Sequence, residues 1–318
     1  MKNILPSDNK KRKWLAIGLT ILLAGILTLW GIYGLGEYGI APFVLTPLFM
    51  GASSTILYGL KKEIAYKEAW QIGFLTLGIF SAGLLIFAIE GLICIAMAAP
   101  IALFLTWIGV LIGYAIVNKT PNNAPTALFI LIALIPLTAF VEKENEPNLT
   151  SVVTAIEIAA TPQAVWKNVV TFPELDKPTE LIFKTGIAYP INAKIEGTGV
   201  GAIRHCNFTT GSFVEPITVW DEPQLLKFEV IEQPEPMKEL SFWDIDAPHL
   251  HDYFVSKQGQ FKLTKLPNGN TLLEGTTWYY HNIKPAFYWQ LWSDYVIHKI
   301  HQRVLNHIKK NAENEPKN

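Results

Sequence analysis

The chain has 318 residues, of which 50% are hydrophobic and only 17% are charged, and its formal net charge is -1. A soluble protein usually carries roughly 25% charged residues, so this chain is short of surface charge. The near-zero net charge excludes the basic face of a nucleic-acid-binding protein. The two cysteines are too few for a disulfide scaffold. The composition therefore indicates a membrane protein, or a membrane region joined to a soluble one.

The charges divide the chain near residue 147. Residues 1–147 carry 10 Lys/Arg and 8 Asp/Glu, whereas residues 148–318 carry 16 and 19 together with all seven histidines. A short acidic linker, residues 142–147, lies at the break and ends in proline. We therefore expect a transmembrane region at 1–147, a globular domain at 148–311 and a polar tail at 312–318.

The first region contains apolar stretches of membrane-spanning length. A transmembrane helix needs about 20 predominantly apolar residues. Five stretches are candidates, and the last has only 16 residues, so four spans are the alternative: 14–35, 40–60, 71–89, 92–117 and 126–141. Glu90 lies where the long apolar stretch must turn, and it is either a solvated turn residue or a functional group at membrane depth. The sequence thus predicts an all-α bundle of five spans.

The positive charges predict the orientation of this bundle. Nine Lys/Arg fall in one set of loops and termini, and one falls in the opposite set. Basic loops remain on the cytoplasmic side, so the N-terminus should be cytoplasmic. Five spans then place the C-terminal domain on the extracytoplasmic side, whereas four would return it to the cytoplasm, and the bias favours five. We expect an integral protein of a bacterial inner (plasma) membrane.

The second region begins with a strand and two short helices. Residues 151–158 have valine and isoleucine at strand spacing, and Thr161-Pro162 is a typical helix start. A second short helix is expected at 173–182. Period-two patterns then predict six strands, followed by one long helix from residue 285 to about 310: strands 191–197, 200–208, 212–220, 225–232, 253–265 and 271–281. One helix can cover only part of a curved seven-stranded sheet, so a cavity between them is expected.

The segment from Val153 to Trp166, VTAIEIAATPQAVW, resembles the start of the START / polyketide cyclase-like (SRPBCC, helix-grip) superfamily. In that family a strand leads through small residues and proline to a first helix bearing Val-Trp. The resemblance covers roughly residues 150–310. It implies an α+β helix-grip fold with a seven-stranded antiparallel sheet around the long C-terminal helix. It also implies a hydrophobic pocket for lipids, sterols or polyketides, and some members are cyclases or hydrolases. The membrane region is not part of the usual family pattern.

Aromatic and apolar residues of the strands and the last helix are the candidates to line that pocket. Each could instead simply fill the core, because aromatic side chains dominate core packing as well. The candidate ligand-binding residues are Phe213, Trp220, Phe228, Phe261, Trp278, Tyr280, Trp289, Trp292, Tyr295 and Val296.

Three polar residues within strand patterns are candidate catalytic groups. Glu215 lies on the Phe213/Ile217 face, Glu274 lies on the Trp278/Tyr280 face, and Arg204 lies on a neighbouring strand. A buried carboxylate must find a partner or change its pKa, which makes it an acid/base candidate. The alternative is that the register is misread by one residue, which would place these groups on the outer face.

The histidines and cysteines give weaker signals. The pairs His249/His251 and His298/His301 could contribute metal ligands, but no third ligand follows at a fixed spacing, so we expect no metal and no cofactor. Cys206 has no evident base beside it. The segment 197–201, which is rich in glycine, connects two strands and reads as a hairpin turn rather than a nucleotide-binding loop.

These features favour a membrane-anchored protein whose C-terminal domain binds a lipid or another hydrophobic small molecule. The alternative is a cyclase/dehydratase-like or hydrolase-like enzyme that uses a pocket carboxylate or histidine. A third possibility is a structural or regulatory domain that contacts a protein partner through an exposed apolar patch. The expected partners are the hydrophobic molecule and the bilayer, with no nucleic acid, and the sequence identifies no protein partner.

Overall fold

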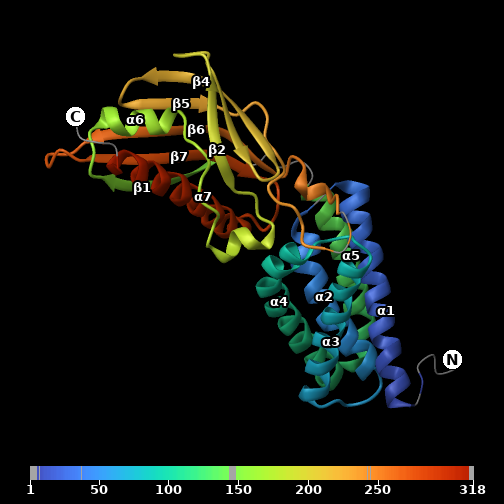
Figure 1. The fold of residues 1–318 in the computed structure, drawn as a ribbon. Coiled ribbons are helices and arrows are strands. Elements are labelled where there is room, and N and C mark those ends of the chain that lie inside the picture. The colour runs from blue at the N-terminus through green and yellow to red at the C-terminus, as the bar shows by residue number, and fades with distance from the viewer. Residues whose placement is uncertain are drawn as a thin grey trace. The chain divides into compact units, whose positions relative to one another are not determined.

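The computed structural model describes residues 6, 8–36, 38–142, 148–241, 243 and 245–314, so most of the predicted linker and of the polar tail lies outside the described residues. The chain forms two compact units (Figure 1). One contains Met1–Glu146 with the short segments Ser241–Pro248 and Ile283–Ala286, and the other contains the remaining residues. The first is helical, and the second combines a sheet with helices.

Five helical segments of the first unit are long and apolar enough to cross a membrane, judged by length and composition. The break between α3 and α4 coincides with the turn predicted near Glu90, whose carboxylate accepts a hydrogen bond of 2.9 Å from the Tyr38 hydroxyl. The elements are α1 (Asn9–Leu29) with η1 (Trp30–Leu35), η2 (Ala41–Leu45) with α2 (Thr46–Gly59), α3 (Tyr66–Ile86), α4 (Leu92–Lys119), and η3 (Pro121–Asn123) with α5 (Ala124–Glu142).

Glycines allow α2 and α4 to touch through their backbones. A Cβ atom on Gly51 would lie 2.2 Å from the Thr106 carbonyl oxygen, and one on Gly109 would lie 2.1 Å from the Leu48 carbonyl oxygen. Only glycine fits at such distances. Small residues at a helix–helix contact let the two backbones approach one another closely.

The second unit is a seven-stranded antiparallel sheet in the order β1-β7-β6-β5-β4-β3-β2, which curls around one long helix (Figure 1). The helix-grip-like arrangement that the sequence resemblance implied is therefore confirmed. In chain order the elements are β1 (Thr150–Ile158), α6 (Pro162–Val170), η4 (Leu181–Thr185), β2 (Pro190–Glu196), β3 (Ile203–Phe208), β4 (Gly211–Asp221), β5 (Leu225–Glu229), η5 (Pro248–Leu250), β6 (Phe254–Lys265), β7 (Thr271–His281) and α7 (Ala286–Asn314).

The helix start at Thr161-Pro162 is confirmed, because Thr161 Oγ1 accepts a hydrogen bond of 3.4 Å from the Ala164 amide.

The prediction of a second short helix at 173–182 is wrong, because only η4 is helical in this part of the chain. The amides of Phe172 and Leu175 instead donate to carbonyl oxygens within β2. Since β2 is an edge strand with unpaired backbone groups, pairing with it competes successfully with helix formation in a segment that contains two prolines.

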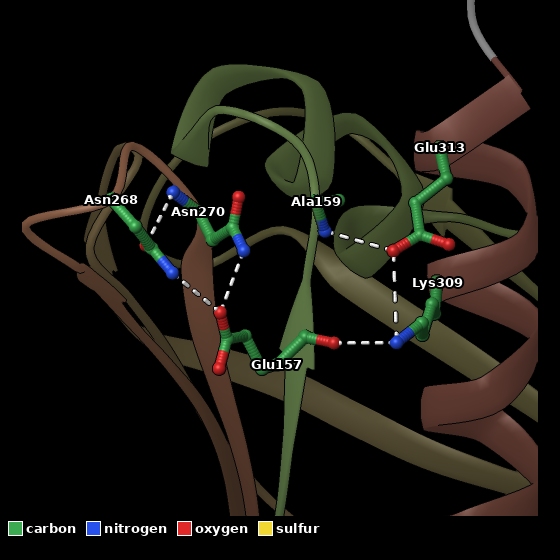
Figure 2. Close-up of polar contacts among 6 residues, drawn as sticks. All are labelled: Glu157, Ala159, Asn268, Asn270, Lys309 and Glu313. Carbon is green, nitrogen blue, oxygen red and sulfur yellow. Dashed lines mark hydrogen bonds and ion pairs between the residues drawn. The ribbon is translucent and has the colours of Figure 1, made fainter.

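The C-terminal half of α7 packs on the concave face of the sheet and is held there by polar contacts at its end. Val304, Leu305, Ile308 and Ala312 belong to a buried cluster with residues of α6 and the strands. Figure 2 shows the polar contacts, which we call the α7 latch: Lys309 Nζ donates to the Glu157 carbonyl oxygen at 2.8 Å, Glu313 accepts from the Ala159 amide at 2.8 Å, and the Glu157 carboxylate accepts from Asn268 and Asn270.

Candidate functional site

Alternation along β7 and β1 decides which side chains face α7. Thr277 and Tyr279 of β7 hydrogen-bond to side chains of α7, and so does Thr154 of β1. Successive side chains of a strand point to opposite faces. The odd-numbered residues of β7 therefore face the helix, and the even-numbered residues face away from it.

The prediction that Trp278, Tyr280 and Glu274 face the cavity is consequently wrong. Their strand is offset by one residue from the predicted facing, so these side chains point to the opposite side of the sheet. All three lie on the outer face, where lysine side chains of β5 and β6 cover them. Lys227 Nζ lies 5.2 Å from the centroid of the Trp278 ring, Lys257 Nζ lies 5.4 Å from that of Tyr280, and Lys262 Nζ lies 3.8 Å from a Glu274 oxygen. The aliphatic stem and the charge of lysine can both cover an aromatic ring, so an aromatic-rich face need not be the inner one.

Glu215 does point inward, and the structure brings it together with Arg204. The two residues are directly opposite one another on β4 and β3 and form an ion pair. Their exposed fractions are 5% and 1%. The guanidinium carbon lies 5.3–5.6 Å from the ring centroids of three aromatic residues, which enclose it: Phe172, Phe228 and Phe261.

The protonation behaviour of this buried cluster argues against a catalytic role. Burial raises the pKa of the Glu215 carboxyl, although the Arg204 guanidinium opposes the shift. Burial acts to lower the pKa of Arg204, but the interactions with Glu215 and Cys206 together outweigh that effect and raise the pKa. Burial also raises the pKa of the Cys206 thiol to about 12, which leaves no thiolate at neutral pH. Arg204 and Glu215 neutralise one another and offer no free acid or base.

A strip of polar side chains lies on the other half of α7. Asp294, His298 and His301 share one helix face because of their spacing. Asp294 Oδ1 accepts a hydrogen bond of 2.6 Å from the Tyr279 hydroxyl. His298 Nδ1 and His301 Nδ1 lie 2.8 and 3.0 Å from Thr154 Oγ1, and His301 Nε2 lies 2.8 Å from Thr277 Oγ1. We call this set the polar strip.

Burial shifts the pKa values of two members of the polar strip, His301 and Tyr279. It lowers the pKa of His301 to about 4, with a smaller contribution from the neighbouring His298. It also raises the pKa of Tyr279, as does the hydrogen bond to Asp294. His301 is therefore neutral at neutral pH. Its side chain nevertheless remains partly exposed, so the space beside it is open to solvent.

The remaining candidate lining residues differ in accessibility. Phe213, Trp220 and Phe261 pack against the buried cluster from the concave face and are partly exposed, whereas Phe228 is buried. On α7, Trp289 is buried, Trp292 and Val296 are partly exposed, and Tyr295 is exposed with Lys299 Nζ 5.8 Å from its ring centroid. Whether these side chains contact a ligand stays a prediction.

Sequence reasoning missed Thr154 and Thr277, because a lone threonine in a strand carries no functional signal. It did recognise that His298 and His301 share a helix face. The other histidine pair is placed differently: His249 is buried, with its Nε2 atom 3.9 Å from a Glu239 oxygen. A surface hollow of about 500 Å³ lies over β2, lined by residues 171–174 and 192–195, and none of the candidate residues lines it.

No protein-family model matches the sequence, and no curated protein resembles it significantly in sequence. Several solved structures are similar to the second unit. A norcoclaurine synthase point mutant from Thalictrum flavum in complex with a transition-state analogue is 13% identical, with 53% of this chain and 97% of that chain covered and a TM-score of 0.35. A protein from Nitrosospira multiformis is 16% identical, with 53% and 100% covered and a TM-score of 0.35. XoxI from Bacillus cereus is 13% identical, with 52% and 96% covered and a TM-score of 0.35.

Proposed function

We propose that this protein is a membrane-anchored binding protein whose second unit holds a lipid or another hydrophobic small molecule between α7 and the sheet. One observation carries the proposal. Apolar side chains on the concave face are only partly buried, although they pack against the core: Ile156, Phe208, Phe213, Trp220 and Phe261. A completed core would bury such residues. Apolar walls that stay accessible, with a few convergent polar groups nearby, are typical of small-molecule sites.

Neither of the two carboxylates proposed as catalytic groups is placed where it could act in the enzyme alternative. Glu274 lies on the outer face beside Lys262, and Glu215 is paired with Arg204 inside an aromatic enclosure. A general acid or base must reach the reacting group within hydrogen-bond distance, and neither carboxylate is free to do so. Binding of a ligand requires no such group, so the geometry supports binding better than catalysis.

The membrane anchor and its orientation belong to the same proposal. Five apolar helices of sufficient length and the nine-to-one bias of Lys/Arg support an anchor with a cytoplasmic N-terminus and an extracytoplasmic second unit. A reporter enzyme fused to the C-terminus, active only outside the cytoplasm, tests this topology. Activity supports five spans, whereas activity of a cytoplasmic reporter at the same position would contradict them.

Binding is tested on the full chain in lipid nanodiscs by titration with radiolabelled methyl decyl ketone. Nanodiscs without protein measure the partitioning of the ketone into the lipid, which rises linearly. The proposal predicts an additional saturable component of about one ketone per chain, because each chain has one concave face lined by partly buried apolar side chains. Uptake that stays linear and equal to that of protein-free discs would exclude the proposed binding function.

A further inference from the structure

The polar strip continues into a longer series of hydrogen bonds that we call the histidine chain. Lys299 Nζ lies 3.1 Å from Gln302 Oε1, and Gln302 Nε2 lies 2.9 Å from His298 Nε2. From His298 the series passes through Thr154 and His301 to Thr277. Each of these groups can donate or accept only in certain ways, so the direction of every bond can be worked out.

The direction is set at the lysine end. An ammonium group only donates, so Lys299 fixes the oxygen of the Gln302 amide toward itself and the NH2 group toward His298. His298 Nε2 must then accept, because it faces a donor 2.9 Å away. A neutral imidazole carries one proton, which places that proton on His298 Nδ1. This atom therefore donates to Thr154 Oγ1 at 2.8 Å.

The hydrogen bond that Thr154 accepts from His298 fixes which atom donates in the hydrogen bond between Thr154 and His301. Thr154 is only 6% exposed, and among the described residues its hydroxyl has no side-chain acceptor other than His301 Nδ1. Leaving a buried hydroxyl without an acceptor is unfavourable, so its proton points to His301 Nδ1. His301 is neutral, and its own proton must then be on Nε2. That atom donates to Thr277 Oγ1 at 2.8 Å.

The chain ends with a donor that has no acceptor. Thr277 Oγ1 accepts from His301, and its own proton meets no acceptor in the part of the chain that the structure describes. Thr277 is on the concave face and is partly exposed, so its hydroxyl proton is accessible from that face. We propose that the Thr277 hydroxyl donates a hydrogen bond to an oxygen of the hydrophobic ligand, an inference that rests on the proposed binding function.

The charges around Thr277 favour a neutral ligand oxygen, such as that of a ketone, an ester or an alcohol. Tyr279 is two residues away on the same face, about 7 Å along the strand, and it holds the Asp294 carboxylate. Arg204, a cation on the concave face, is already paired with Glu215. A carboxylate ligand would meet the repulsion of Asp294, and Arg204 is not free to offset it, so fatty acids should bind less well than neutral compounds of the same length.

The test compares Thr277→Val with Thr276→Val in the full chain in nanodiscs. Valine keeps the shape of threonine and removes the hydroxyl, and Thr276 is the adjacent threonine on the outer face. Three labelled probes of equal chain length are titrated: methyl decyl ketone, dodecane and laurate. Thr277→Val should weaken ketone binding roughly threefold to tenfold, as expected for one hydrogen bond. Dodecane binding should not change, Thr276→Val should bind as the wild type does, and laurate should bind the wild type more weakly than the ketone.

The outcomes separate this inference from the function on which it rests. If neither the ketone nor dodecane binds the wild type saturably, the binding function itself is wrong. If both bind but Thr277→Val affects them equally or not at all, the donor role of Thr277 is wrong. Unchanged dodecane affinity also shows that the variant is folded.

A spectroscopic measurement tests the direction of the chain without any ligand. Nitrogen NMR of the full chain with labelled histidine reports which ring nitrogen carries the proton. The account predicts Nδ1–H for His298 and Nε2–H for His301. The opposite pair of tautomers would make the Thr277 hydroxyl a donor to His301 and would overturn the proposal.

Discussion

The two halves of α7 face the same sheet with different chemistry. From Val304 onward the helix presents apolar side chains to a buried cluster, and the α7 latch ties its last turns to the end of β1. Glu157 of β1 in turn accepts hydrogen bonds from the β6–β7 turn. From Asp294 to His301 it presents a carboxylate and two imidazole groups to a tyrosine and two threonines, and the Gln302 amide contacts one of these imidazoles. The first half is closed, and the second remains partly open to solvent.

This difference shows how one helix can stabilise the fold and serve a site. Burial of apolar surface supplies most of the folding free energy, roughly 25 cal/mol for each Å², and the closed half provides it together with α6. The open half can then keep polar groups and incompletely buried aromatic side chains, because stability does not depend on closing it. The buried Arg204–Glu215 pair lies on the concave face with the closed cluster around it.

The largest effect is expected from breaking that ion pair. Arg204→Met leaves the Glu215 carboxyl buried without its partner and should cost about 3–5 kcal/mol of stability. The double variant Arg204→Met, Glu215→Leu removes both charges and should recover much of this loss. Urea unfolding, followed by hydrogen exchange of the β3 and β4 amides in the full chain, measures both. Additive losses in the double variant would show that the two charges do not depend on one another.

A smaller effect is expected from acid acting on the open half. The pKa of His301 is about 4 in the folded protein and 6.5 in the unfolded chain. Below pH 6.5 the unfolded state therefore binds a proton that the folded state does not. Stability should be greatest above this range, fall by about 3 kcal/mol as the pH drops to about 4, and level off below it.

Hydrogen exchange of the β1 and β7 amides during urea unfolding, repeated at several pH values, follows this loss. His301→Gln should remove most of the pH dependence between these limits, whereas His205→Gln, a change at a partly exposed position on β3, should leave it in place. An equally steep dependence in His301→Gln would assign the titration to another group and would contradict the neutral state of His301.

The smallest effect is expected at the α7 latch. Lys309→Met removes an ammonium group that contacts the Glu157 carbonyl oxygen and lies 3.7 Å from a Glu313 oxygen, in an exposed setting where ion pairs contribute little. Hydrogen exchange should become faster in the last turns of α7 while the β3 and β4 amides stay protected. Lys265→Met is the matched control and should change neither. Faster exchange throughout the sheet would show that the latch, rather than the closed cluster, holds the helix in place.

The sequence predicts the order of elements well, because period-two and helical patterns are local. The sequence does not correctly predict which face of β7 points toward the helix. Its outer face carries Trp278 and Tyr280, which lysines cover, while its inner face carries Gly275 and Thr277. A Cβ atom on Gly275 would lie 3.6 Å from Leu305, an ordinary van der Waals contact, so the helix covers this inner face although its residues are small. Composition alone therefore indicates the wrong face.

The candidate site is predictable only in part. His298 and His301 share a helix face through their spacing, and that relation is local. Their partner Thr154 is 144 and 147 residues away, so nothing in either segment identifies it. Glu215 and Arg204 are recognisable as polar residues in strand patterns, but whether they act as free groups or as a pair depends on the register of β3 with β4. Long-range register decides the chemistry of the site.

The most direct test of the central claim is to fill the space between α7 and the sheet and measure binding again. Ile156 of β1 is partly buried on the concave face, and Val153 of the same strand is 54% exposed on the other. In nanodiscs, Ile156→Trp in the full chain should abolish saturable binding of methyl decyl ketone, while Val153→Trp should bind as the wild type does. Hydrogen exchange of the β3 and β4 amides confirms that both variants are folded. Unchanged binding in folded Ile156→Trp would contradict a ligand site on the concave face.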